Sequence, residues 1–306
     1  MTPFPQPISE QVVLITGASA GIGAALAQAL AHRWTGIRLV LAARNQDKLT
    51  RVADLCSKAG ADVITVPTDM SDVAQVQALA QAAIATFGRV DVLVNNAGYG
   101  QMGPIELIPP SAVQRQFQVN VLGTIALIQA LTPVMRNQGG GKIINISSIA
   151  GRIAFPLGGL YSASKFALEA LSDTLRRELD PFNIRVSIIE PGPVSTEFFE
   201  VVNREVDYAI PDGGANSPYR AAFENLENLD QLTRRQAWTS EQVASVIVKA
   251  IGATYPRSRY VAATAGDFLV FMMTKLLPTR LVDLFWQKFY GIDLVAKDWN
   301  NQRKAG

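Results

Sequence analysis

The sequence predicts an α/β fold with a doubly wound parallel sheet, formed by a single domain over residues 1–306. Two observations support this prediction. Short runs made almost entirely of apolar residues alternate with longer segments in which apolar residues recur at helical spacing. Strands without alternating polar residues are typical of a parallel sheet that helices cover on both faces, and the longer segments then serve as crossovers.

The first strand is expected at Val12–Ile15, which is wholly apolar and leads into a loop rich in glycine, alanine and serine. Further runs of this kind follow at regular intervals, and a last short one lies near the end of the chain. In order, these expected strands are Ile37–Ala42, Asp62–Pro67, Val90–Val94, Lys142–Ile146, Arg185–Ile189 and Arg259–Ala262.

Helices are expected between the strands because the apolar residues of these segments fall on one side at 3.6 residues per turn. In the first helix Ile22, Leu26 and Leu30 recur at this spacing. The others are expected at Gln46–Ala59, Ala74–Phe87, Phe117–Met135, Tyr161–Leu179 and Thr239–Ile251. Thr239 or Ser240 is the expected N-cap of the last one, because a hydroxyl oxygen there accepts from a free backbone N–H.

The pattern changes after Pro191-Gly192-Pro193. Residues 195–237 are richer in polar and turn-forming types, with a strong turn signal at Pro211-Asp212-Gly213-Gly214, and we expect them to form a substrate lid. Residues 265–306 are expected to form a C-terminal helical tail. Its apolar residues recur at helical spacing up to Gly291, with a break at Pro278.

Composition excludes several classes of function. With 28 basic and 26 acidic side chains the net charge is only +2, so no general basic field holds a nucleic acid, and none is expected as a partner. One cysteine, Cys56, and one histidine, His32, exclude a disulfide framework and a Cys/His zinc site, and no metal is expected. No run approaches the ~18 apolar residues of a membrane span, and residues 1–11 lack the pattern of a secretory signal. We expect a cytoplasmic protein that touches a membrane at most peripherally.

Three glycines follow the first strand with the spacing GxxxGxG: Gly17, Gly21 and Gly23. The first permits a sharp turn, the second lets backbone amides approach a diphosphate, and the third lets the helix pack close to the sheet. The alternative is a tight strand-to-helix turn that binds nothing. The apolar strand before the loop and the amphipathic helix after it favour a dinucleotide site.

The end of the second strand bears on the choice of dinucleotide. Many dinucleotide-binding folds place a carboxylate there for the adenosine 2′-hydroxyl. Here the strand ends Leu41-Ala42-Ala43-Arg44, with no acid before Asp47. A guanidinium binds a 2′-phosphate in bidentate fashion, so Arg44 favours NADP(H) over NAD(H). The alternative is a solvated loop arginine.

Tyr161 and Lys165 are four residues apart, which puts both side chains on one face of a helix. A phenol ionises near pH ~10, so it needs a positive neighbour to exchange protons at neutral pH. The alternative is an ordinary surface pair. Ser148 follows the strand Lys142–Ile146, at the edge where parallel sheets bind ligands, and is suited to donate to a substrate oxygen; Ser147 is equally suited to a structural role.

In combination these motifs resemble the compact single-domain branch of the short-chain dehydrogenase/reductase family, which has a Rossmann fold. The resemblance covers about residues 10–200. The 13-residue step from Ser148 to Tyr161 is usual in that family, which favours Ser148 over Ser147. The motifs are Thr16-Gly17-Ala18-Ser19-Ala20-Gly21-Ile22-Gly23, Asp69, Asn95-Asn96-Ala97-Gly98, Asn120, Ser148, Tyr161-x-x-x-Lys165 and Pro191-Gly192.

The resemblance implies four catalytic residues, Asn120, Ser148, Tyr161 and Lys165. Tyr161 would protonate the carbonyl oxygen during reduction and act as the base in the reverse direction. Lys165 would lower the pKa of this phenol and hold the nicotinamide ribose, Ser148 would polarise the carbonyl, and Asn120 would fix a proton-relaying water. For Asn120 the alternative is an amide that bonds backbone inside a helix.

The resemblance also implies a nicotinamide cofactor, NADP (NADPH) on the evidence of Arg44, which supplies the hydride. Asp69 would accept from the adenine amino group, Asn95 would steady the central strands, and residues 191–194 with Thr196 would flank the carboxamide. The expected cofactor-binding set is Gly17, Ser19, Ala20, Gly21, Ile22, Gly23, Arg44, Asp69, Asn95, Ala97, Gly98, Tyr161, Lys165, Pro191, Gly192, Val194 and Thr196.

The C-terminal third is longer than in the family's minimal members and resembles, more weakly, hydroxysteroid and retinol dehydrogenase-like members. The lid segment carries Phe198, Phe199, Val201, Val202, Tyr208 and Tyr219. These residues favour a bulky apolar ketone or aldehyde, or they pack a longer core. The alternatives are oxidation of a lipophilic secondary alcohol and a non-catalytic NADP-binding sensor. The complete catalytic set argues against the sensor.

From Pro256 to Gly306, eight basic side chains accompany four acidic ones, a net charge of +4, beside several aromatic residues. Such a segment is typical of a helix that lies on an anionic membrane, of an interface with a second subunit, or of a segment packed on the protein's own body. The family resemblance leads us to expect a homo-oligomer.

Overall fold

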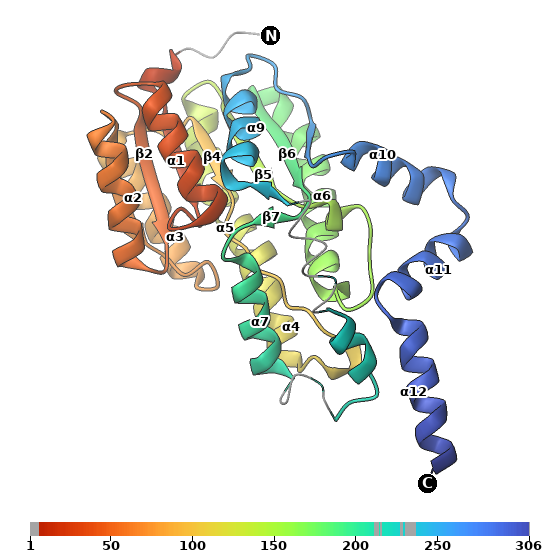
Figure 1. Ribbon diagram of the computed structural model, residues 1–306. Helices are drawn as coiled ribbons and strands as arrows, with labels where there is room; N and C mark the ends of the chain where they lie inside the picture. The colour runs from red at the N-terminus through yellow and green to blue at the C-terminus, as the bar shows by residue number, and fades with distance from the viewer. Residues whose placement is uncertain (1–5, 211–213, 215, 227–228, 230–236, 306) are drawn as a thin grey trace.

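The computed structural model describes residues 6–210, 214, 216–226, 229 and 237–305, without the side chains of residues 301–305 (Figure 1). The predicted strands form one seven-stranded parallel sheet in the order β3-β2-β1-β4-β5-β6-β9, which confirms the predicted fold class. The strands are β1 (Val12–Thr16), β2 (Arg38–Ala43), β3 (Asp62–Pro67), β4 (Val92–Asn95), β5 (Gly141–Ile146), β6 (Ile184–Pro191) and β9 (Arg259–Ala262).

Helices cover both faces of the sheet. Others form the lid (α7) and the tail (α10, α11 and α12). The helices are α1 (Gly21–Arg33), α2 (Gln46–Lys58), α3 (Val73–Phe87), α4 (Pro110–Phe117), α5 (Gly123–Asn137), α6 (Gly159–Leu179), α7 (Phe198–Ala209), α9 (Ser240–Gly252), α10 (Gly266–Phe271), α11 (Thr279–Phe289) and α12 (Ile292–Ala305). Val13 and Ile15 of β1 pack in one core with α1, α2 and α9, whereas Val12 and Leu14 pack in the other with α3 and α5. Because both cores are aliphatic, the strand sequence shows no polar alternation.

The helix predicted at Phe117–Met135 is longer and irregular. It runs from α4 through a π segment, Gln118–Leu122, into α5. Gly123 passes so close to the chain at Met70 that a Cβ there would collide with the Met70 carbonyl oxygen. A π turn inserts an extra residue into a helix and is frequent at functional sites. Here it carries Asn120, one of the predicted catalytic residues.

One stretch, Pro110–Asn137, has the length and hydropathy of a membrane-crossing helix. Polar residues interrupt it, so a search for uninterrupted apolar runs does not find it. It contains α4 and α5, and its residues Leu127, Leu131 and Met135 are fully buried in the core under the sheet. Packing of α5 against the sheet accounts for the apolar character of this stretch.

The predicted lid begins with β7 (Val194–Ser195), which pairs with β8 (Trp238–Thr239), and continues through α7 and a helical stretch at residues 220–226. Residues 211–213 of the predicted turn at Pro211–Gly214 lie outside the described residues. Thr239, one of the two expected caps, accepts from Gln242 N–H and its own N–H donates to the Gln242 side chain.

The end of the chain leaves the sheet at the edge where the strands end. β9 pairs with the last four residues of β6, with Ala262 opposite Pro191. The predicted break at Pro278 separates α11 from α10 and its π extension, Met272–Leu276. Figure 1 shows α10, α11 and α12 as an arm along the α6 side of the molecule, far from β2 and α2.

Candidate active site

A cleft opens along the edge of the sheet at which the strands end. β1 lies between β2 and β4, and the crossovers on its two sides run in opposite directions, which leaves a crevice. This crevice forms part of a cavity of about 2050 Å³. Pockets for single small ligands hold roughly 300–1,000 Å³, so the cavity has room for a dinucleotide together with a substrate.

The glycine loop between β1 and α1 forms one wall of the cleft. Gly17 and Gly21 have φ of +66° and +53°, in the left-handed region that favours glycine. A Cβ at Gly23 would collide with the Gly17 carbonyl oxygen, so close packing of α1 requires the third glycine. The N-cap Ala20 offers no side-chain acceptor to the first N–H groups of α1. These groups are left for a diphosphate, so the loop fits the expected cofactor.

Asn96 and Thr16, for which no role was predicted, hold this loop in place. The Asn96 side chain donates to the carbonyl oxygens of Thr16 and Gly17, at 2.9 and 3.2 Å. The Thr16 hydroxyl accepts from the backbone N–H groups of Asn96 and Ala97, both at 3.0 Å. The ends of β1 and β4 are therefore tied together at the switch point.

Arg44 and Asp69 lie just beyond β2 and β3 and line the same wall. Partial burial acts to raise the pKa of Asp69, but two hydrogen bonds from Ser71, at 2.9 and 2.7 Å, and the nearby Arg44 charge hold it below its usual value. Asp69 is therefore an ionised acceptor. Lys48, which sequence reasoning missed, pairs with Glu197 across this end of the cleft at 2.7 Å.

Ser148, Tyr161 and Lys165 come together elsewhere in the cleft wall. Tyr161 and Lys165 lie one turn apart on α6, and the Lys165 Nζ atom is 5.8 Å from the centre of the Tyr161 ring. Lys165 Nζ also donates to the carbonyl oxygen of Ile146, at the end of β5, at 2.8 Å. Ser148 follows the same strand, and its hydroxyl donates to the Pro191 carbonyl at 3.3 Å and accepts from Ala150 N–H at 3.1 Å. The helical spacing seen in the sequence thus places the predicted pair side by side.

Burial shifts the pKa of both members of this pair. It raises the pKa of Tyr161 to about 12, although the neighbouring Ser148 hydroxyl acts against this. Burial lowers the pKa of Lys165 to about 8, against the effect of the Glu169 charge. Loss of hydration thus has the larger effect on the phenol, and the lowering of its pKa by Lys165 that the family resemblance implies stays a prediction. Tyr161 carries its proton at neutral pH, as a proton donor must.

Asn120 lies behind this group and not in the cleft wall. Its side chain accepts from Tyr99 N–H at 3.1 Å and donates to the Tyr99 carbonyl at 2.9 Å and to Ser164 Oγ at 3.1 Å. Gly98 lies beside both Asn120 and Lys165, because a Cβ at Gly98 would lie 3.2 Å from Asn120 Oδ1 and 3.5 Å from Lys165 Nζ. The amide bonds backbone, and its part in a water relay stays a prediction.

Most of the expected cofactor-binding residues line the cleft. They are Gly17, Ser19, Ala20, Gly21, Ile22, Arg44, Asp69, Ala97, Gly98, Tyr161, Lys165, Pro191, Gly192, Val194 and Thr196. Gly23 and Asn95 do not, because Gly23 packs behind the glycine loop and Asn95 points into the sheet. Asn95 donates to the Asn145 side chain at 2.8 Å and so bridges β4 and β5.

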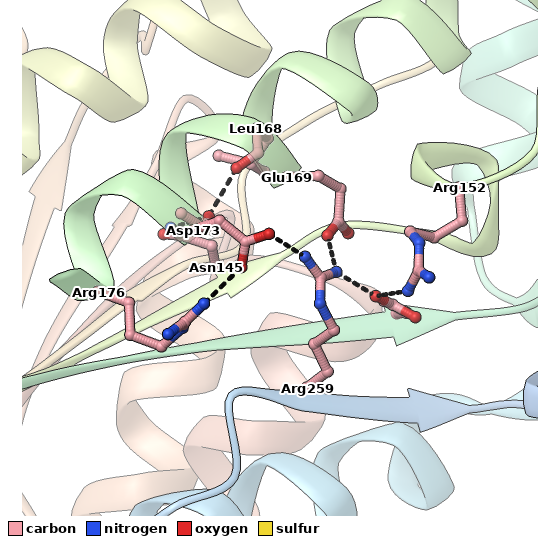
Figure 2. Close-up of polar contacts among 9 residues, drawn as sticks. Asn145, Arg152, Leu168, Glu169, Asp173, Arg176 and Arg259 are labelled. Atoms are coloured by element: carbon pink, nitrogen blue, oxygen red, sulfur yellow. Dashed lines mark hydrogen bonds and ion pairs between the residues drawn. The ribbon is translucent and has the colours of Figure 1, made fainter.

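A cluster of charged side chains, shown in Figure 2, lies behind Lys165. Glu169, one turn further along α6, and Glu190 of β6 are both buried, and Arg259 of β9 bonds to both, with Glu190 at 2.6 Å. Arg152, in the loop after β5, reaches Glu190 at 3.1 Å. Sequence reasoning missed this cluster because its members are scattered along the chain. Within the described ranges, no three His, Cys, Asp or Glu side chains are grouped to hold a metal ion.

The rest of the cleft wall is largely apolar, and part of it comes from the lid. Four of the six predicted lid residues line it: Phe198, Phe199, Val201 and Val202. The Phe198 ring lies 5.7 Å from the Tyr161 ring, measured between centroids. Tyr208 is exposed and Tyr219 donates to Glu106, so neither lines the cleft.

The tail supplies the remaining apolar wall. Trp286 of α11 and Tyr290, the residue after this helix, pack against Phe155, with ring centroids 6.1 and 5.4 Å from the Phe155 centroid. Leu269 and Phe289 also line the cleft. One side of the tail therefore packs on the body of the protein, beside the loop that leads to α6.

Known proteins show a consistent similarity to this chain. Residues 11–207 match the family model described as short chain dehydrogenase. The chain is 35% identical over 273 residues to human (Homo sapiens) 17-beta-hydroxysteroid dehydrogenase type 1, a match that covers 88% of this chain and 82% of that protein. It is 32% identical over 282 residues to 3-ketodihydrosphingosine reductase of Bacteroides thetaiotaomicron, covering 92% of this chain and 98% of that protein.

Solved structures show the same similarity. A short chain dehydrogenase/reductase from Burkholderia phymatum in complex with NAD superposes with a TM-score of 0.76 at 32% identity, over 86% of this chain and 92% of that one. A metagenomic short-chain oxidoreductase in complex with NADP superposes with a TM-score of 0.65 at 31% identity, over 83% and 97%. Proteins of this architecture therefore occur with either dinucleotide.

Proposed function

This chain belongs to the short-chain dehydrogenase/reductase family, and on that premise we propose that it uses NADPH to reduce a hydrophobic ketone or aldehyde to the alcohol. The family consists of oxidoreductases that bind a nicotinamide cofactor, and solved relatives hold NAD or NADP. The proposal adds the choice of cofactor, the direction of the reaction and the class of substrate. Different residues support each of these.

The observation that carries the proposal is the meeting of Ser148, Tyr161 and Lys165 within a largely apolar cleft. Donor groups gather at one point, and the lid and tail contribute aromatic and aliphatic side chains around it. A hydrophobic carbonyl compound is favoured to bind with its oxygen at these donors, because the oxygen would otherwise be buried without a hydrogen bond.

The cofactor supplies the hydride when it is bound. Tyr161, which is protonated at neutral pH, donates its phenolic proton to the carbonyl oxygen. Ser148 donates a hydrogen bond to the same oxygen and so stabilises the negative charge that develops there. Lys165, held beside the ring by the Ile146 carbonyl, stabilises the phenolate that remains after proton transfer.

Arg44 supports NADPH as the cofactor. It lines the cleft directly after β2, is exposed, and has no acidic hydrogen-bond partner among the described residues. A guanidinium in this place binds a phosphate through two parallel hydrogen bonds, whereas the carboxylate typical of NAD sites is missing from Ala42-Ala43-Arg44-Asn45.

The apolar wall supports a bulky hydrophobic substrate. Phe198 and Val202 of α7 face the cleft near Gly100, where a Cβ would lie 3.0 Å from Phe198 Cζ. From the other side Phe155, Trp286 and other aromatic residues enclose the space. The names of the two similar proteins refer to a hydroxysteroid and a ketodihydrosphingosine, which agrees with a substrate of this kind.

A substrate series tests the proposal. NADPH oxidation is followed by absorbance with ketones and aldehydes of increasing size, together with Tyr161→Phe as the control that lacks the proton donor. We expect kcat/KM to rise with apolar surface and turnover to disappear in the variant. A preference for small polar ketones, or activity with NADH equal to that with NADPH, contradicts the proposal.

A further inference from the structure

The outer side of the C-terminal tail carries a group of exposed apolar side chains. We define the tail patch as Phe268, Phe271, Leu276, Leu281 and Leu284, each of which is more than half exposed. They come from α10, its π extension and α11, which form the arm in Figure 1. Isolated exposed apolar residues are common, but five within 17 residues of a protruding segment mark an interaction site.

The body of the protein cannot cover every apolar side chain of α11, because these side chains do not lie on one side of the helix. At about 100° per residue, the apolar side chains from Leu281 to Tyr290, the residue after α11, extend around about two thirds of the circumference. Trp286 and Tyr290 face inward and pack on Phe155. Leu281 and Leu284 lie on a different side and are exposed.

Basic side chains border the patch. Lys275, Arg280 and Lys288 are exposed, and none of them has an acidic partner in the part of the chain that the structure describes. Asp267 and Asp283 also lie in residues 266–289, so the local excess is one positive charge. On a larger scale, the tail, residues 265–306, carries six basic and four acidic side chains, net +2, and residues 1–264 carry 22 of each, net 0. The net positive charge of the chain thus lies in the tail.

This charge pattern fits an anionic membrane better than a second copy of the chain. A two-fold dimer through the patch would bring the same three cations of both copies together. At a membrane surface the apolar side chains enter the boundary between head groups and acyl chains, while lysine and arginine extend to the phosphates. An anionic membrane thus accommodates both the apolar side chains of the tail patch and the cations that border it.

The patch continues into the mouth of the cleft. Phe285 and Phe289 lie between the outward and inward sides of α11, and they line the cleft although they are 43% and 38% exposed. On α10, Leu269 lines the cleft next to Phe268 of the patch. An apolar surface therefore runs from the patch to the site of proton transfer.

We propose that α10 and α11 dock on an anionic membrane through the tail patch and that the cleft takes its hydrophobic substrate from that membrane. The docking stands without the proposed function, whereas the uptake of substrate rests on it. The partner is a phospholipid surface with negative head groups, and no span of the bilayer is involved.

Co-sedimentation of the full chain with vesicles, without cofactor or substrate, tests the docking. We expect binding to vesicles of phosphatidylcholine and phosphatidylglycerol in equal amounts, weakening at high salt, and binding about tenfold or more weaker to phosphatidylcholine alone. The triple variant Leu276→Gln, Leu281→Gln, Leu284→Gln should lose it. Leu55→Gln, at an equally exposed leucine of α2 on the opposite side of the molecule, is the matched control and should bind like the unchanged protein.

Several results overturn the docking: no binding of the unchanged protein to the mixed vesicles, undiminished binding of the triple variant, or equal binding to both kinds of vesicle. A dimer that the triple substitution splits into monomers, in sedimentation equilibrium without vesicle binding, assigns the patch to a second copy instead. Circular dichroism checks that the variant is folded.

Enzyme assays separate the docking from the proposed function. With a small water-soluble ketone and no vesicles, the triple variant should equal the unchanged protein, because the three leucines do not line the cleft. With a ketone that is dissolved in the mixed vesicles, turnover by the triple variant should fall about tenfold. Equal rates of the triple variant and the unchanged protein with the vesicle-dissolved ketone overturn the uptake of substrate from the membrane. If the unchanged protein turns over no ketone at all, only the proposed function is rejected.

Discussion

Arg259 joins β9 to α6, the helix that carries Tyr161 and Lys165, and Arg259→Met tests how strongly this contact stabilises the protein. Glu169 and Glu190 are 5% and 0% exposed, and Arg259 bonds to both. Methionine keeps much of the side-chain volume but removes the charge. Taking one partner from a buried ion pair costs about 3–5 kcal/mol. With an unfolding entropy of ~2.1 cal/mol/K per residue, the melting temperature of a chain of 306 residues should fall by about 5–8 °C.

The loss should also depend on pH. Burial raises the pKa of Glu169, and the nearby Ser147 hydroxyl and the bonded Arg259 guanidinium act against this. Without Arg259 the pKa rises further. An acid whose pKa is higher in the native than in the unfolded state destabilises the native state only when the acid is ionised. The destabilisation is therefore absent below the pKa of the unfolded state, and it grows as pH rises through the pKa of the native state. The variant should therefore lose more stability at about pH 8 than at about pH 5.

Thermal and denaturant unfolding, followed by circular dichroism, measure the loss. The matched control is Arg176→Met, because Arg176 bonds Asp173 of the same cluster at 3.0 Å but this pair is about one third exposed and should contribute only ~0–1 kcal/mol. Adding Glu169→Gln to Arg259→Met should restore part of the stability, since Glu169 then lacks a cationic hydrogen-bond partner, whereas Glu190 keeps its bond to Arg152. A loss for Arg259→Met no larger than for the control would refute the reasoning that these carboxylates depend on Arg259.

Four further changes test other parts of the structure. Tyr161→Phe should abolish turnover and preserve NADPH binding, measured by fluorescence, because only the proton donor is lost; retained turnover would point to a different acid. Arg44→Gln should weaken NADPH binding about tenfold or more and leave NADH binding nearly unchanged; equal losses would remove the phosphate role. Burial lowers the pKa of Lys142 to about 8, so the unfolded state binds the proton of this side chain more tightly than the native state does. The free energy of unfolding should therefore rise by about 3 kcal/mol from pH ~8 to ~10.5. Denaturant titrations measure this rise, and Lys142→Met should remove it. Thr239→Ala should cost about 1 kcal/mol through the lost capping box, whereas Ser245→Ala on the same helix should change little.

Features with local physical requirements could be predicted from the sequence. A strand buried on both faces must be apolar throughout, which made Val12–Ile15 recognisable. Gly17 adopts a backbone conformation that other residues avoid, so its place after the strand was informative. Helical spacing alone put Tyr161 and Lys165 on one side of α6.

Features that depend on distant contacts could not be predicted in this way. The bonds of Asn96 to Thr16 and of Arg259 to Glu169 join residues far apart in the chain, and they follow from the order of the strands. Periodicity holds no information about such pairs. The pKa of Tyr161 could not be predicted from its helical neighbour alone for a related reason, because it also depends on the burial of the ring, beside which Phe198 of the lid packs.

The position at which β9 ends affects how the substrate range of such a protein can change during evolution. The chain leaves the sheet at Ala262, whose carbonyl accepts from Gly192 N–H, beside the wall of the cleft. Any residues added after this point emerge at the rim of the cavity. Insertions, deletions and substitutions there can alter which molecules enter, while the glycine loop and α6 keep their sequence. Two proteins that descend from one ancestor can thus catalyse the same reaction on different substrates.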